Sequence, residues 1–100
     1  MILVYITNPD KKTVLKVARH LLAKKLIACG NIFPAESLYM WQSKKTQAKE
    51  FVLLAKTIDK HFTAIQKEVA KIHPYKIPCV IKIASKANSA FLTWLKGEVV

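Results

Sequence analysis

Glycine and acidic residues are both scarce in this chain of 100 residues. Its two glycines, Gly30 and Gly97, cannot form a glycine-rich loop that cradles a phosphate group. Six Asp and Glu residues oppose 17 Lys and Arg residues, which gives a formal charge of +11. The carboxylates are dispersed and form no evident catalytic pair, and nothing local activates either cysteine as a nucleophile. We therefore expect a protein that is not an enzyme.

Long apolar runs and cysteine motifs are also missing. The longest run without a charged residue, Leu26–Ala35, has ten residues, about half of what a membrane-spanning helix needs. Met1–Pro9 has neither a basic start nor a small-residue cleavage site, so no signal peptide is expected. The sequence therefore predicts a cytoplasmic protein without a membrane partner. Cys29 and Cys79 are then expected to be free thiols.

What the chain has in excess is apolar residues and lysine. Apolar residues make up 52% of the sequence, enough to exclude a disordered chain, and the length predicts a single domain, 1–100. So many apolar side chains on a small domain favour an oligomer. The lysines are spread over the whole chain, which favours a solvated, non-specific surface, with an anion-binding face as the alternative.

The first half of the chain reads as a strand, a helix and a second strand. Ile2–Thr7 is a continuous apolar and β-branched run, typical of a strand buried on both faces. Apolar residues at helical spacing from Val14 to Leu26 predict an amphipathic helix. Cys29–Trp41 predicts a second strand region, interrupted near Pro34, and the polar segment 42–49 predicts a connection.

The second half repeats the pattern. Glu50–Thr57 predicts a third strand, and Asp59 is expected to cap a helix that ends before Pro74. Ile77–Ala84 predicts a fourth strand, and Ser89 a short closing helix. Two strand–helix–strand units around a hairpin correspond to an α+β, ferredoxin-like βαββαβ sandwich with a short C-terminal helix.

Five segments of the sequence resemble one known family. They are Cys29-Gly30-Asn31-Ile32; Ser37, Tyr39 and Trp41; Glu50 and Leu53 before Lys56-Thr57; His73-Pro74-Tyr75 with Pro78; and Phe91-Leu92 with Trp94-Leu95. Together they cover nearly the whole chain in one register, and on them the chain resembles the CutA divalent-ion-tolerance proteins.

The resemblance implies a cytoplasmic homotrimer with PII-like architecture. It also implies a role in tolerance of copper and other divalent metals, without an established catalytic activity. By analogy, the central hairpin would pair across subunits and leave clefts at the three interfaces. The chain departs from the family at Ser43, where many relatives have glycine, at 44–49, where they carry acidic residues, and at Lys76, where Glu or Gln is common.

Cys29 and His73 are the best candidates for metal ligands, because they match family positions. Thiolate and imidazole suit copper or zinc, but no pair of ligands has the spacing of a known metal motif. The alternatives are a small buried side chain for Cys29 and a helix-end contact for His73. Lys76 beside His73 would repel a divalent ion, so we expect at most weak binding of copper or zinc.

A second set of residues predicts a ligand cleft or the trimer interface: Tyr39, Trp41, Glu50, Lys56, Tyr75 and Lys76. The lysines would suit an anionic small molecule and the aromatic rings would supply stacking faces; the alternative is that these residues hold the subunits together. Glu50–Lys56 has one aromatic residue and no glycine, so we expect no specific nucleic acid partner.

Overall fold

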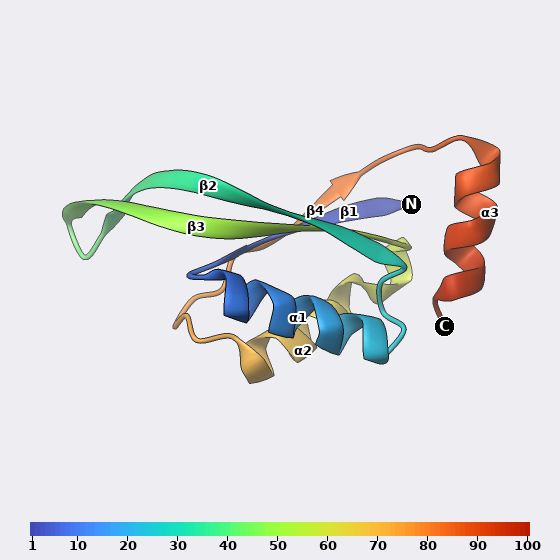
Figure 1. Cartoon of the computed structure of the whole chain (residues 1–100), viewed down its shortest axis with the longest axis horizontal. Helices are drawn as coiled ribbons and strands as arrows, with labels where there is room; N and C mark the ends of the chain where they lie inside the picture. Colours follow the sequence, from blue (N-terminus) through green and yellow to red (C-terminus); the bar gives the residue numbers. More distant parts are fainter.

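Four strands form one antiparallel sheet, and two helices cover one of its faces in the computed structural model of residues 1–100 (Figure 1). The strands lie in the order β2-β3-β1-β4, and they are β1 (Ile2–Asn8), β2 (Cys29–Trp41), β3 (Lys44–Thr57) and β4 (Val80–Ala84). The covering helices are α1 (Lys11–Ala23) and α2 (Phe62–Ile72); a 3₁₀ turn (Asp59–His61) precedes α2, and α3 (Ser89–Glu98) closes the chain. The ferredoxin-like prediction is confirmed.

The core lies between the sheet and the two covering helices. The predicted burial of β1 on both faces is wrong for the single chain. Every second residue is buried, because successive side chains of a strand point to opposite faces and the helices cover only one of them. Val4 and Ile6 of β1 and Leu53 of β3 are fully buried in this layer. They pack with the apolar stripes of the helices, including Leu21 and Ile65. The apolar stripes of the two helices and the covered face of the sheet thus form one core.

Helix α1 ends at Ala23, three residues before the expected Leu26. Lys25 adopts a left-handed conformation with φ 56°, and the Leu26 N–H donates to the Leu21 carbonyl at 3.0 Å. This is the pattern of a Schellman cap. The cap turns the chain so that Leu26 folds back into the core instead of extending the helix.

Strands β2 and β3 form a long hairpin that projects beyond the rest of the sheet (Figure 1). The segment 44–49 was expected to be a connection, but it belongs to β3 and pairs with β2 in register up to Trp41 and Lys44. Gln42 and Ser43 close the hairpin with φ values of 50° and 64°, as in a type I′ turn. Pro34 does not interrupt β2, because β2 is an edge strand and one of its sides needs no hydrogen-bond donors. We call the projecting part, residues 36–49, the arm.

Three other predicted element boundaries were wrong. Asp59 begins the 3₁₀ turn and accepts a 2.9 Å hydrogen bond from Lys82 Nζ instead of capping α2. Asn88, not Ser89, occupies the N-cap position of α3. Strand β4 begins at Val80 rather than Ile77, beyond Pro78, which has no N–H to donate to a ladder.

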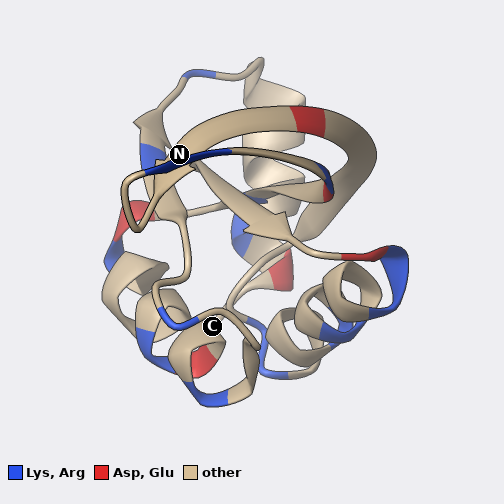
Figure 2. Cartoon of the chain, turned by 90° about the vertical axis from the view of Figure 1, so that its left-hand side faces the viewer, with Lys and Arg blue, Asp and Glu red and all other residues tan.

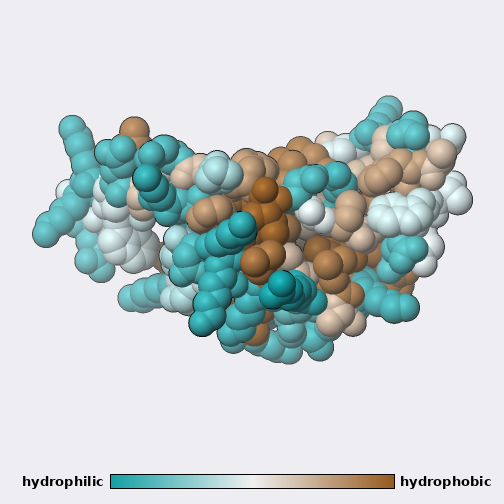
Figure 3. All heavy atoms as spheres, in the orientation of Figure 1, coloured by the Kyte–Doolittle hydropathy of each residue, from teal (hydrophilic) through white to brown (hydrophobic).

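The face of the sheet opposite the helices remains uncovered in the single chain. Leu3 and Tyr5 of β1 pair with Ile83 and Ile81 of β4, so these four side chains share that face. Ile81 and Ile83 are 48% and 42% exposed, and Phe33 of β2 is 40% exposed. Figure 3 shows hydrophobic residues gathered over the middle of the molecule, while the end of the arm is mostly hydrophilic.

Basic residues gather on the helix layer, although they are scattered along the sequence (Figure 2). Glu68 of α2 is the acidic residue among them; it lies 2.8 Å from His20, 2.8 Å from Lys71 and 3.6 Å from Lys24. The hydrogen bonds from Lys71 and His20 lower the pKa of Glu68 to about 2. None of the helices is long and apolar enough to cross a membrane.

Candidate functional site

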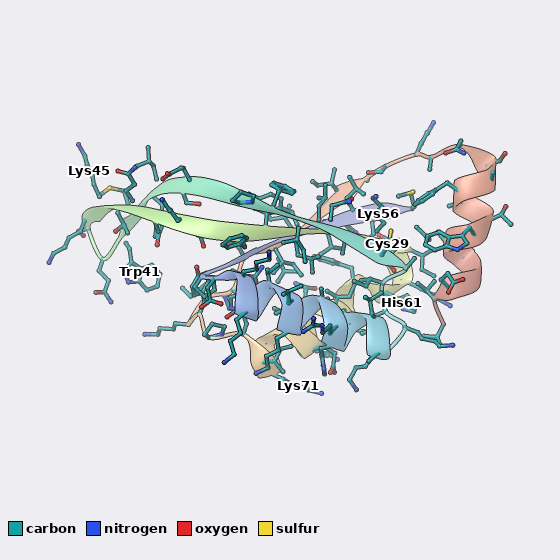
Figure 4. All side chains as sticks on the ribbon, in the orientation of Figure 1. Cys29, Trp41, Lys45, Lys56, His61 and Lys71 are labelled. Carbon is teal, nitrogen blue, oxygen red and sulfur yellow. The ribbon has the colours of Figure 1, made fainter.

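A groove of about 800 Å³ lies between the arm and the loop that follows α2. Residues from β1, β2, β3 and the loop line it: Thr7, Glu36, Ser37, Leu38, Tyr39, Trp41, Glu50, Pro74, Tyr75, Lys76, Ile77 and Cys79. The volume is in the range of small-molecule sites. Trp41 projects from the arm (Figure 4).

The groove brings together five of the six predicted cleft residues: Tyr39, Trp41, Glu50, Tyr75 and Lys76. Lys56 is not among them. It lies six residues after Glu50 on β3, about 20 Å along an extended strand. There its ammonium is 5.7 Å from the centre of the Phe91 ring, near α3 (Figure 4).

Glu50 and Tyr75 form the polar centre of the groove. The Tyr75 hydroxyl donates a 2.6 Å hydrogen bond to Glu50 Oε2, and Glu50 is only 7% exposed. Burial, followed by the hydrogen bond to Glu50 and its charge, raises the pKa of Tyr75 above its ordinary value. Tyr75 therefore remains a protonated donor, and the pair connects the loop after α2 to β3.

His73 holds the start of the same loop against β1. Its Nε2 lies 2.9 Å from the Thr7 carbonyl oxygen, and its Nδ1 accepts from the Tyr75 N–H at 3.1 Å. Since a carbonyl can only accept and an N–H can only donate, the ring is neutral with its proton on Nε2. Burial lowers the pKa of His73, although the Thr7 contact and the Glu50 charge act in the opposite direction.

Cys29 and His73 lie far apart within one chain. Cys29 pairs with Lys56, and Lys56 pairs with Leu3 near the start of β1. His73 binds Thr7, four residues further along β1, or about 13 Å. No three His, Cys, Asp or Glu side chains gather as a metal site would require. A site that uses both ligands would need a second subunit, and a metal on His73 would replace a backbone contact.

The sequence did not predict that Cys79 and Ile77 would line the groove. The sequence pattern places both in the fourth strand, Ile77–Ala84, whereas they belong to the loop before β4. Two prolines, Pro74 and Pro78, were the available signal, because proline interrupts strand pairing.

Comparisons with known proteins agree with this fold. Residues 2–98 match the family described as CutA1 divalent ion tolerance protein. The chain is 38% identical over 97 residues to the divalent-cation tolerance protein CutA of Archaeoglobus fulgidus, covering 96% of this chain and 95% of the relative.

Solved structures give the same result. A structure described as the periplasmic divalent cation tolerance protein CutA from Archaeoglobus fulgidus superposes with a TM-score of 0.97 and 36% identity, over 100% of both chains. The PII-like protein CutA from Nostoc has a TM-score of 0.92 at 22% identity, covering 100% of this chain and 98% of that one, and supports the PII-like fold. The chain therefore belongs to the CutA1 divalent ion tolerance family.

Proposed function

We propose that this protein acts in the tolerance of divalent cations as a cytoplasmic homotrimer without catalytic activity. The observation that carries the proposal is the family match over residues 2–98, since the relatives are named for divalent-cation tolerance and not for a reaction. The lack of a disulfide between Cys29 and Cys79 supports the cytoplasmic placement, because disulfides are rare in that compartment. Fractionation of the source cells tests it, and recovery in a periplasmic fraction would contradict it.

The uncovered face of the sheet supports assembly. Ile81, Ile83 and Phe33 are each at least 40% exposed, beside the half-buried Leu3 and Tyr5. A contiguous apolar face on a protein of this size is typical of a subunit interface. Packing of these faces around a threefold axis would bury them, and the arms would then extend along neighbouring subunits.

Assembly can be tested with two matched substitutions. Ile83→Glu places a charge on the uncovered face, and Leu22→Glu makes a comparable change at a 44% exposed position of α1. We expect wild type and Leu22→Glu to elute as trimers in light-scattering chromatography, and Ile83→Glu to dissociate. A monomeric wild type would refute the trimer.

We propose that the protein binds copper or zinc weakly, through Cys29 of one subunit and His73 of another. The thiol of Cys29 is partly accessible, but Lys56 stands directly across from it on β3. An ammonium about 6 Å from a divalent ion costs about 1–5 kcal/mol, depending on the effective dielectric. A monovalent Cu(I) ion would suffer half of this penalty, so we expect it to bind more tightly than Zn(II).

Native mass spectrometry of the reduced protein, titrated with Cu(I) and then Zn(II), tests the metal site. We expect stepwise uptake by wild type, loss of uptake in Cys29→Ser combined with His73→Ala, and unchanged uptake in Cys79→Ser. Unchanged uptake in the double variant would show that the chosen ligands are wrong. Growth of a deletion strain in copper, complemented by each variant, tests the role in tolerance.

No observation favours the alternative of an anionic ligand in the groove. That alternative depended on Lys56 and Lys76, and Lys56 lies outside the groove, near Phe91. The lining contains the carboxylates of Glu36 and Glu50 and only one ammonium group, that of Lys76.

A further inference from the structure

The charged residues that line the groove are mostly acidic, whereas the protein as a whole is strongly basic. Its lining holds two of the six acidic residues of the chain, Glu36 and Glu50, but one of the 17 basic residues, Lys76. Elsewhere the surface is dominated by lysine, as on the helix layer. The lining of the groove therefore carries an excess of one negative charge in a strongly basic protein, and this favours a cation. Lys49 pairs with Glu36 across the hairpin and lines the adjoining hollow, so Glu50 is the carboxylate on which the preference for a cation depends.

Glu50 is a buried carboxylate without a cationic partner. None of the four salt bridges of the chain includes it, although 17 basic residues are available. The Tyr75 hydroxyl bonds to Oε2, whereas Oε1 accepts no hydrogen bond from the protein and is not enclosed, since Asn8 Oδ1 is the only fully buried side-chain oxygen without a partner. Oε1 of this largely buried carboxylate therefore faces the groove, where it is free to pair with a positive group.

Aromatic rings complete the surroundings of this carboxylate. Tyr39 and Trp41 are 43% and 42% exposed and line the same groove, and Tyr75 lies beside Glu50. Aromatic faces attract ammonium and guanidinium groups, and rings combined with a carboxylate recognise organic cations. A bare metal ion would find too few oxygen ligands here, because no cluster of three suitable side chains is present.

We propose that the groove binds an organic cation, an alkylammonium or guanidinium group, with Glu50 as its counter-ion and Tyr39 and Trp41 as its aromatic wall. The inference is independent of the proposed metal-tolerance role. The same chemistry has two sources: a free amine, or a lysine of a second copy of this chain. Lys44 and Lys45 at the tip of the arm are exposed and exemplify the second source.

Fluorescence of Trp41 gives a direct test. The chain has two tryptophans, so Trp94→Phe leaves Trp41 as the single reporter. This protein is titrated with n-butylammonium, with n-butyltrimethylammonium and, as the anion of matched size, with butyrate, all at constant ionic strength. We expect saturable changes with both cations and none with butyrate. Glu50→Gln, which retains an acceptor for Tyr75, should weaken cation binding at least tenfold, and Glu36→Gln less.

The oligomeric state of the same variants distinguishes the sources. If the amines bind and assembly does not depend on Glu50, the cation is a free ligand. The cation comes from a second copy of the chain if no amine binds but assembly is weakened at least tenfold both by Glu50→Gln and by the double variant Lys44→Gln with Lys45→Gln. The proposal is wrong if butyrate binds as tightly as the amines, or if neither amine binding nor assembly depends on the charge of Glu50. Metal uptake, measured separately, is expected to be unchanged in Glu50→Gln.

Discussion

The hydroxyl of Tyr75 lies 2.6 Å from Oε2 of Glu50, and this contact joins the loop after α2 to the third strand across 25 positions of the sequence. Removing the donor with Tyr75→Phe leaves a carboxylate that is 7% exposed without its hydrogen bond. We expect a loss of about 1–3 kcal/mol in the free energy of unfolding, measured by urea denaturation. A change below about 0.5 kcal/mol would mean that water replaces the hydroxyl at little cost.

The neutral state of His73 makes stability depend on pH. Its pKa in the folded protein is lowered below the ordinary 6.5, so the unfolded chain takes up the proton first as the pH falls. The stabilising contribution is therefore complete above pH 6.5 and is lost as the pH falls through the lower folded value.

Comparison of wild type with His73→Gln isolates this contribution, because other titrating groups cancel in the difference. We expect the stability advantage of wild type to shrink between pH 7.5 and pH 5 in urea denaturation. A constant difference would show that His73 does not titrate in that range.

Lys25 occupies a left-handed position that glycine would adopt without strain, since its φ is 56°. We expect Lys25→Gly to raise the free energy of unfolding by about 1 kcal/mol. Ala23, the exposed last residue of α1, is the matched control, and Ala23→Gly should lower stability by about 0.5–1 kcal/mol. If both substitutions destabilise equally, the left-handed cap does not form in solution.

The two glycines are expected to respond oppositely to alanine. A Cβ at Gly30 would lie 2.6 Å from Cδ1 of the fully buried Leu53, whereas a Cβ at Gly97 in α3 meets nothing within 4 Å. Gly30→Ala should destabilise by about 1–3 kcal/mol. Gly97→Ala should be neutral or stabilising by up to about 1 kcal/mol. Thermal or urea denaturation measures both, and a neutral Gly30→Ala would show that Leu53 can move aside.

The order of strands and helices, and the side of each helix that faces the core, could be predicted from residue patterns. Leu21, for example, falls on an apolar helical stripe. Strand β1 is apolar throughout, so its pattern does not choose a face, and only the structure shows that Val4 and Ile6 face the core. The order of the elements and the apolar stripes of the helices depend on residues only a few positions apart, so they can be predicted without knowledge of the fold.

The predicted boundaries failed where distant contacts outweigh local preference. The segment 42–49 is polar, and on that pattern it was predicted to be a connection, yet pairing with β2 holds residues 44–49 in a strand and only Gln42 and Ser43 form the turn. Likewise, Leu26 extends the helical pattern of α1, but burial in the core and the turn at Lys25 favour an earlier end.

The groove shows the same division between local pattern and tertiary contact. Tyr39, Trp41, Glu50, Tyr75 and Lys76 could be predicted as a set, because they lie in or beside the segments that resemble the CutA family. Three facts could be learned only from the tertiary structure: Lys56 lies outside the groove, Cys29 is distant from His73, and Glu50 is buried without a cationic partner. They depend on the register of the strands and on the path of the loop after α2, which no local pattern specifies. Local pattern thus assigned the chemistry of the side chains, and the long-range pairing of β3 with β1 and β2 decided which of them meet.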